Sequence, residues 1–154
     1  MARRSLSEFT LDDQLCFALY SASRAMTAAY RDGLARLGLT YTQYVVMLLL
    51  WEHGTLSMSR LGERLHLDSA TLSPVIKRMA TQRLVTRRRS AHDERNVEIT
   101  CTSTGHALRD RVRAVQAAVE QRSGLSGGEL ATMRADLHRL AARLREDPAV
   151  SNWS

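Results

Sequence analysis

Apolar residues near the start of the chain recur at steps of three and four, which is the spacing of one helix face. The positions are Leu15, Leu19, Ala22, Met26 and Ala29. The pattern predicts a long helix that opens at the capping-box-like segment 10–13 and runs to about Leu37, with Gly38 as its stop. This apolar stripe is expected to supply the core.

Capping residues divide the next segment into three shorter helices. A capping box at 40–43 opens a helix over 41–53 that ends at Gly54, and Ser57 or Ser59 caps a helix over 58–65. A further helix is predicted over 69–82. If Asp68 is its cap, Pro74 removes one early backbone hydrogen bond; if Ser73 is the cap, Pro74 takes the favourable first position. The sequence leaves both open.

Periodicity then changes from that of helices to that of strands. Segments 84–89 and 96–102 alternate apolar and polar residues around the polar turn SAHDER, which predicts a β-hairpin. A helix over 104–122, capped by Thr102 or Ser103, follows. The last helix starts at the capping box 126–129 and carries leucines and methionine at helical spacing. The order predicts a mainly α chain with a small β-hairpin wing, a winged helix-turn-helix.

The 154 residues suggest a single domain over 1–154. Its DNA-binding part is expected over about 40–102. The segments 10–38 and 103–147 are expected to be dimerisation helices, because one subunit cannot cover their long apolar seams. The sequence therefore predicts a homodimer.

Composition adds a basic block to this picture. The net charge is +6, and seven Lys or Arg against two acidic residues give +5 between Lys77 and Arg95. Such a block suits a polyanion, although a solvated basic surface would look the same. No apolar run reaches the roughly 18 residues that span a bilayer, and no signal peptide is apparent. We expect a cytoplasmic protein with no membrane partner.

If the partner is DNA, the helix over 69–82 would enter the major groove. Short hydroxyls there suit phosphate or base contacts, and the cations suit phosphate or guanine. Arg95 at the wing tip would approach the minor groove, oriented by Asp93. The candidate DNA-binding residues are Ser69, Thr71, Ser73, Lys77, Arg78, Arg87, Arg89, Asp93 and Arg95.

The chain has two cysteines, Cys16 and Cys101, and neither has the spacing of a disulfide framework or a zinc site. The five histidines show no metal-ligand spacing either, so we expect no metal and no cofactor. Cys16 shares a helix face with Tyr20 and Tyr30. A small buried cysteine packed among aromatic residues would give the same pattern.

The order of the elements, the wing segment DERNVEIT and the following TSTG resemble the MarR family of dimeric winged-helix regulators. The runs LCFALY and LTYTQY resemble its organic-hydroperoxide-sensing, OhrR-type branch. The resemblance covers roughly residues 10–145. It implies that Cys16 reacts with peroxide. It also implies that Tyr30 and Tyr41 reach across the dimer to hydrogen-bond the sulfur, with Tyr20 nearby.

One departure from that branch concerns the second thiol. Two-cysteine members carry a resolving cysteine where this chain has Glu120, Gln121, Arg122 and Ser123. We therefore interpret the chain as a one-cysteine type, with Cys101 at the end of the wing hairpin. Because Cys16 would lie some six residues into its helix, the helix dipole alone should not ionise it. Phenol donors would favour the thiolate, and oxidation to sulfenic acid would break their network.

Three functions follow from these expectations. The first is a repressor that binds pseudo-palindromic operator DNA as a homodimer and is released when an organic hydroperoxide oxidises Cys16, with a small thiol as a candidate partner of the oxidised sulfur. The second keeps the fold but is released by a non-covalent phenolic or lipophilic acid. The third, a thiol peroxidase, ranks last because no paired resolving cysteine is present, so we expect a protein that is not an enzyme.

Overall fold

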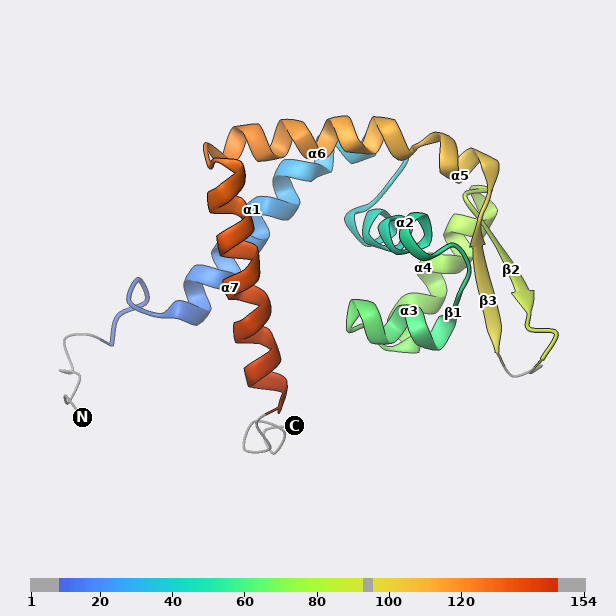
Figure 1. The fold of residues 1–154 in the computed structure, drawn as a ribbon, viewed down its shortest axis with the longest axis horizontal. Coiled ribbons are helices and arrows are strands. Elements are labelled where there is room, and N and C mark those ends of the chain that lie inside the picture. The colour runs from blue at the N-terminus through green and yellow to red at the C-terminus, as the bar shows by residue number, and fades with distance from the viewer. Residues whose placement is uncertain (1–8, 93–95, 147–154) are drawn as a thin grey trace. The chain divides into compact units, whose positions relative to one another are not determined.

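The computed structural model describes residues 9–92 and 96–146. Contacts divide the chain into two units, Met1–Ala117 and Ala118–Ser154, and each is described by itself. The first unit contains most of the elements, and α6 begins in the first unit and ends in the second (Figure 1). The elements are α1 (Leu15–Ala35), α2 (Tyr41–His53), β1 (Leu56–Ser57), α3 (Met58–Leu65), α4 (Ser69–Thr81), β2 (Val85–Arg89), β3 (Val97–Cys101), α5 (Ser103–Ala107), α6 (Arg109–Ser123) and α7 (Gly127–Glu146).

Several predicted caps are confirmed. Thr40 and Gln43 form the full capping box of α2, which ends at His53 before Gly54. Ser57 accepts a hydrogen bond from the Arg60 amide at 3.1 Å and caps α3. Local side-chain chemistry therefore fixes both helices at their predicted bounds.

The alternatives at Pro74 are resolved in favour of Asp68. The Asp68 carboxylate accepts a hydrogen bond from the Thr71 amide at 2.6 Å, and Pro74 lies inside α4. Since proline has no N–H, the carbonyl of Ala70 lacks its usual helical donor. The same bond from Thr71 holds the pKa of Asp68 below its ordinary value of 3.8.

The predicted start of the first helix is wrong. The helix begins at Leu15, after Gln14, whose side chain makes no capping bond. The Thr10 hydroxyl instead donates to the Asp13 carboxylate at 2.6 Å, so it does not cap a backbone amide. Cys16 is consequently the second residue of α1, in its first turn.

The hairpin is confirmed, and the sheet has one strand more than predicted. β2 and β3 pair antiparallel, with Val85 opposite Cys101 and Arg88 opposite Glu98. The two-residue strand β1 pairs with the other edge of β3, which gives the order β1-β3-β2. Such a short strand has too few residues to show an alternating pattern.

The predicted helix over 104–122 is broken at Leu108. Thr102 caps α5 by accepting from the Gly105 amide at 3.1 Å, as expected. The Gly105 carbonyl, however, accepts from the Trp51 indole at 3.2 Å and from the Leu108 amide at 3.2 Å. The Gly105 carbonyl is therefore bonded to the Trp51 side chain of α2 and to the amide three residues on, instead of the amide four residues on. For this reason α5 ends here and α6 begins as a separate helix.

The core of the first unit lies between α2, α3, α4 and the sheet, which gather together in Figure 1. Its fully buried side chains include Val46, Met47, Leu50, Leu61, Leu72, Ile76, Met79 and Ile99. Where α1 meets α6, a Cβ on Gly33 would lie 2.6 Å from Val115 Cγ1. The two helices can therefore pack this closely only because residue 33 has no side chain. The observed order of elements confirms the winged helix-turn-helix prediction.

The apolar stripe of α1 does not supply the core as predicted. Leu15 is 63% exposed and Met26 is 42% exposed, whereas the buried residues of the helix are Tyr30 and Leu34. On α7, Met133, Leu137 and Leu144 are exposed as well. Both helices therefore carry exposed apolar side chains. Among the described residues, no helix is long and apolar enough to cross a membrane.

Candidate functional site

Cys16 is an exposed free thiol in the first turn of α1. The first turn of a helix carries unpaired backbone amides and the positive end of the dipole, and both favour an anion there. The expectation that Cys16 lies beyond this field is wrong, because the helix starts later than its sequence suggests. Cys16 is thus an exposed thiol at the N-terminal end of α1.

Tyr20 lies one helical turn after Cys16 and is also exposed. Its hydroxyl accepts a hydrogen bond from Arg24 Nη1 at 2.9 Å, and the guanidinium carbon lies 5.4 Å from the ring centroid. Arg24 was not among the predicted site residues. A donor on the phenol oxygen leaves the phenol proton available for another acceptor.

Tyr30 and Tyr41, both predicted, meet in an aromatic cluster with a third residue, Tyr44. Tyr30 stacks on Tyr44 with centroids 5.2 Å apart, and Tyr41 meets both rings edge-on at 5.8 and 5.6 Å. Tyr44 and Tyr30 are buried, and Tyr41 is 38% exposed. Tyr44 was not predicted, although its position three residues after Tyr41 signals a shared helix face.

The chain does not bring Cys16 to this cluster. Cys16 and Tyr30 lie fourteen residues apart on the same continuous helix, which separates them by about 21 Å at 1.5 Å per residue. A tyrosine hydroxyl cannot bridge that length. Any hydrogen bond between Tyr30 and a Cys16 sulfur must therefore involve a second copy of the chain.

Cys101 has a different environment. It is 8% exposed, and its thiol donates to the Thr102 carbonyl at 3.5 Å. Burial raises the pKa of Cys101 above its ordinary value of 9.0, while a hydrogen bond with Trp51 lowers it by less. The sulfur is packed so closely that a Cβ on Gly105 would lie 2.7 Å from it. Cys101 thus has the properties of a structural thiol.

The helix-turn-helix consists of α3, a turn with His66 in the left-handed conformation (φ 54°), and α4. Leu72, Ile76 and Met79 face the core. Every predicted contact residue of α4 is exposed, namely Ser69, Thr71, Ser73, Lys77 and Arg78. Ala70 and Pro74, which were not predicted, are exposed too.

The wing carries three consecutive exposed arginines, Arg87, Arg88 and Arg89. Arg88 lies opposite Glu98, whereas Arg87 lies opposite Ile99 and Arg89 opposite Val97. The two predicted residues, Arg87 and Arg89, thus share one strand face, and Arg88 shares the other with an acid. The predicted contacts Asp93 and Arg95 lie outside the described residues.

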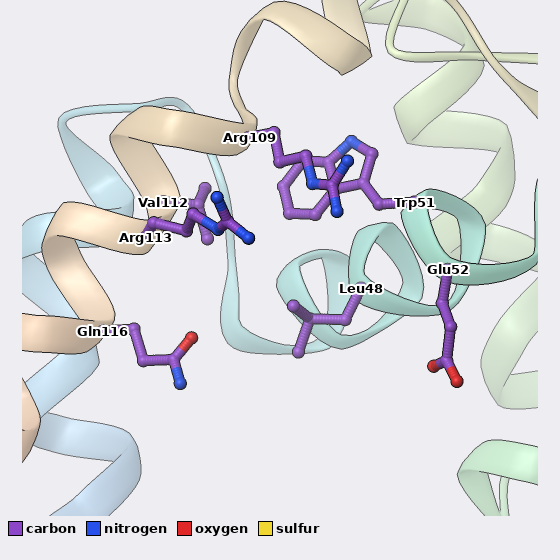
Figure 2. Close-up of a pocket in the computed structure, with 7 residues that line it drawn as sticks. All are labelled: Leu48, Trp51, Glu52, Arg109, Val112, Arg113 and Gln116. Atoms are coloured by element: carbon purple, nitrogen blue, oxygen red, sulfur yellow. The ribbon is translucent and has the colours of Figure 1, made fainter.

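A pocket of about 230 Å³ opens between α2 and the first part of α6 (Figure 2). Leu48 and Trp51 of α2 face Arg109 and Arg113, which extend from α6. Glu52, Val112 and Gln116 complete the lining. Over residues 9–92 and 96–146, no group of three or more His, Cys, Asp or Glu side chains could hold a metal ion.

The fold, the basic wing and the outward-facing α4 define a winged-helix transcriptional regulator. The sequence profile of the SarA/Rot transcriptional regulators matches residues 29–112. The organic hydroperoxide resistance transcriptional regulator of Bacillus subtilis is 43% identical over 136 residues, which cover 88% of this chain and 92% of that protein. The chain belongs to the MarR/SarA family of winged-helix transcriptional regulators, and the predicted resemblance is confirmed.

Solved structures agree with this assignment. The structure of reduced AbfR bound to DNA has a TM-score of 0.73 at 33% identity and covers 92% of this chain and 99% of that one. Overoxidized AbfR bound to DNA has a TM-score of 0.72 at 33% identity, with 90% and 97% covered. AbfR comes from Staphylococcus epidermidis. AbfR, which this chain resembles, has thus been solved on DNA in both a reduced and an overoxidized form.

Proposed function

We propose that the protein is a homodimeric repressor that binds pseudo-palindromic operator DNA and is released when an organic hydroperoxide oxidises Cys16. One observation carries the proposal. An exposed thiol lies in the first turn of α1, while the tyrosines of the same chain form a cluster about 21 Å further along. A second copy would supply the donors that the thiol lacks, and the exposed apolar stripe of α1 gives such a copy a surface to cover.

The chemistry requires only the peroxide as oxidant. The Cys16 thiolate attacks the terminal peroxide oxygen, so that an S–O bond forms as the O–O bond breaks. The leaving alkoxide takes a proton and departs as an alcohol, and the sulfur becomes a sulfenic acid. Hydroxyls of Tyr30 and Tyr41 from the other subunit would hydrogen-bond the thiolate beforehand. Sulfenic acid is neutral and itself a donor, so this network would rearrange.

The next step for the Cys16 sulfenic acid would be reaction with a thiol from outside the chain. Cys101 is buried, and residues 120–123 contain no cysteine, so no second thiol of the chain is placed to form a disulfide with Cys16. A small cellular thiol could condense with the sulfenic acid, forming a disulfide and releasing water. Without rapid reduction the reaction runs once per subunit, which suits a regulator in the cytoplasm rather than a peroxidase.

The α4 surface and the wing would make the DNA contacts. Ser69, Thr71, Ser73, Lys77 and Arg78 are the proposed contacts of α4. Arg87, Arg89, Asp93 and Arg95 are the proposed contacts of the wing. Six more cations than acids across the chain, concentrated near these residues, favour a polyanion. Two subunits related by a twofold axis would need two half-sites on the operator.

The pocket between α2 and α6 favours a second candidate function, release by a non-covalent ligand. Arg109 and Arg113 offer guanidinium donors, and Leu48 and Trp51 offer apolar contact (Figure 2). A phenolic or lipophilic acid would satisfy both. In that case Cys16 would not take part in release.

Fluorescence anisotropy of labelled duplex distinguishes these functions. The duplex would be the sequence that the reduced protein enriches from a random pool. Cumene hydroperoxide should release the wild type from it, and dithiothreitol should restore binding, whereas salicylate should have no effect. Cys16→Ser should bind DNA normally and resist release. Normal peroxide release of Cys16→Ser would overturn the redox proposal, and release by salicylate would favour the ligand.

A further inference from the structure

In its first two turns, the outermost point of the proposed DNA-recognition helix is apolar. With about 100° of rotation per residue, Ala70 and Pro74 both lie about 160° from Leu72, on either side of the direction that points away from the core. Thr71 and Ser73 lie only about 100° from Leu72, and Ser69 about 60°. The predicted hydroxyl contacts therefore flank this pole, and two hydrocarbon side chains occupy it.

The burial pattern agrees with this placement. Leu72, Ile76 and Met79 are fully buried, whereas Ala70 and Pro74 are exposed. Ser69, by contrast, lines a groove of about 330 Å³ with Met58 and Gly62 of α3 and Val97 of β3. Ser69 thus faces sideways toward the wing, and Ala70 and Pro74 face outward.

Ala70 and Pro74 are four residues apart, so their side chains adjoin on the helix surface. Lys77 lies beside them at about 140° from Leu72. A helix that enters the major groove brings its outermost residues closest to the base edges, while cations at its flank reach phosphates. Only thymine presents a hydrocarbon group, its C5 methyl, on that edge.

We infer that Ala70 and Pro74 form an apolar surface that recognises a thymine methyl group in each operator half-site. This inference rests on the proposed function, and it adds a specificity determinant to it. The ring of Pro74 presents its carbons rigidly, because proline has fixed φ and little side-chain freedom. Proline is unfavourable inside a helix. A contact with a thymine methyl group, which needs a shallow hydrocarbon surface, would account for a proline at this exposed position.

Deoxyuridine scanning tests the inference directly. Deoxyuridine keeps the pairing and the O4 acceptor of thymidine but lacks the methyl group. The probe is the duplex that the reduced full-length protein enriches from a random pool, with each thymine replaced in turn in both half-sites. Wild-type protein should lose about fourfold in affinity for each buried methyl group at one or two positions per half-site, and nothing elsewhere.

The same scan on Pro74→Ser assigns the contact. Serine removes the ring carbons, and it has a higher helix propensity than proline, so α4 should persist. The variant should bind thymine and deoxyuridine duplexes equally at the sensitive position. Lys77→Ala is the matched control on the same surface, and it should weaken binding to both duplexes while keeping the fourfold ratio.

Three results would overturn the inference. Wild-type protein could show no sensitivity to deoxyuridine at any position, or Pro74→Ser could keep the wild-type ratio. In either case DNA binding and the proposed function would stand. Failure of the pool to enrich any duplex would overturn the proposed function as well, so the two failures are distinguishable.

Discussion

Tyr30 of α1 stacks on Tyr44 of α2, with ring centroids 5.2 Å apart and 25° between the ring planes. Tyr41 packs edge-on against both. Tyr44 therefore holds in place the two phenols that are proposed to contact Cys16 of a second subunit. It acts through those phenols rather than on the sulfur.

Tyr44→Leu should weaken both the fold and the sensor. Each aromatic pair contributes about 0.5–1.5 kcal/mol, so losing two pairs should lower the free energy of unfolding by about 1–3 kcal/mol in urea titration. Oxidation of Cys16 by cumene hydroperoxide should slow, because Tyr30 and Tyr41 lose their support. Val46→Ala, at a fully buried position of the same helix, should cost about 0.5–2 kcal/mol without slowing oxidation. Equal oxidation rates in the two variants would show that Tyr44 is only a packing residue.

Asp68 should make the stability of α4 depend on pH. The Thr71 amide lowers the pKa of Asp68 below 3.8, so its contribution is present above that pH and is lost as the pH falls through the folded-state value. Asp68→Asn keeps a capping oxygen but cannot titrate. The difference in Tm between wild type and this variant should shift against the wild type as the pH is lowered from about 6 to about 3. A pH-independent difference would contradict this account of the cap.

Cys101 should react with alkylating reagents more slowly than Cys16. It is buried and its pKa is raised, so little thiolate forms near neutral pH, whereas Cys16 is exposed. Iodoacetamide should label Cys16 first in the native protein, as followed by peptide mass spectrometry. Because the folded state resists ionisation, Cys101 should also cost stability as the pH rises above 9.0, and Cys101→Ser should remove that loss. Loss of peroxide release in Cys101→Ser would instead make Cys101 a resolving partner.

The wing arginines should differ in their effect on DNA binding. Arg88 lies opposite Glu98 in the hairpin register and shares a strand face with this acid, whereas Arg87 lies on the other face. Arg87→Ala should reduce the slope of log K against log salt by about one unit for each phosphate that Arg87 neutralises. Arg88→Ala should reduce it less. The opposite order would place the phosphate backbone on the Glu98 face of the wing.

Local chemistry made much of this fold predictable from the sequence. The capping box at Thr40 and Gln43 and the alternation in the wing depend on residues close together in the chain, and the structure has both. Two failures had non-local or competing causes. The break at Leu108 depends on Trp51, 54 residues before Gly105, and Thr10 pairs with Asp13 instead of capping a helix.

The candidate site was harder to predict, because the sequence pattern identifies polar and charged residues as contacts and passes over apolar ones. In the first two turns of α4, the outward pole is formed by Ala70 and Pro74, which carry no polar side-chain atom. Tyr44 packs against both predicted tyrosines, and its contact with Tyr30 joins α2 to α1, which a local sequence pattern does not show. The late start of α1 places Cys16 in the first turn. It could not be inferred from Thr10, because the Thr10 hydroxyl can bond either to a backbone amide as a cap or to the Asp13 carboxylate, as it does here.

The most direct test of the central claim uses two heterodimers, each purified through two different tags. In the first, one chain carries Cys16→Ser and the other carries Tyr30→Phe and Tyr41→Phe. In the second, one chain is wild type and the other carries all three substitutions. Each heterodimer contains a single Cys16, and the rate of its oxidation by cumene hydroperoxide is measured.

If Cys16 meets the tyrosines of the other subunit, the first heterodimer retains one intact site and should react at the wild-type rate per thiol. The second should react about tenfold or more slowly, because a hydrogen bond to a charged group contributes about 1.5–3 kcal/mol. Fast oxidation in the second heterodimer and slow oxidation in the first would contradict a site shared between subunits.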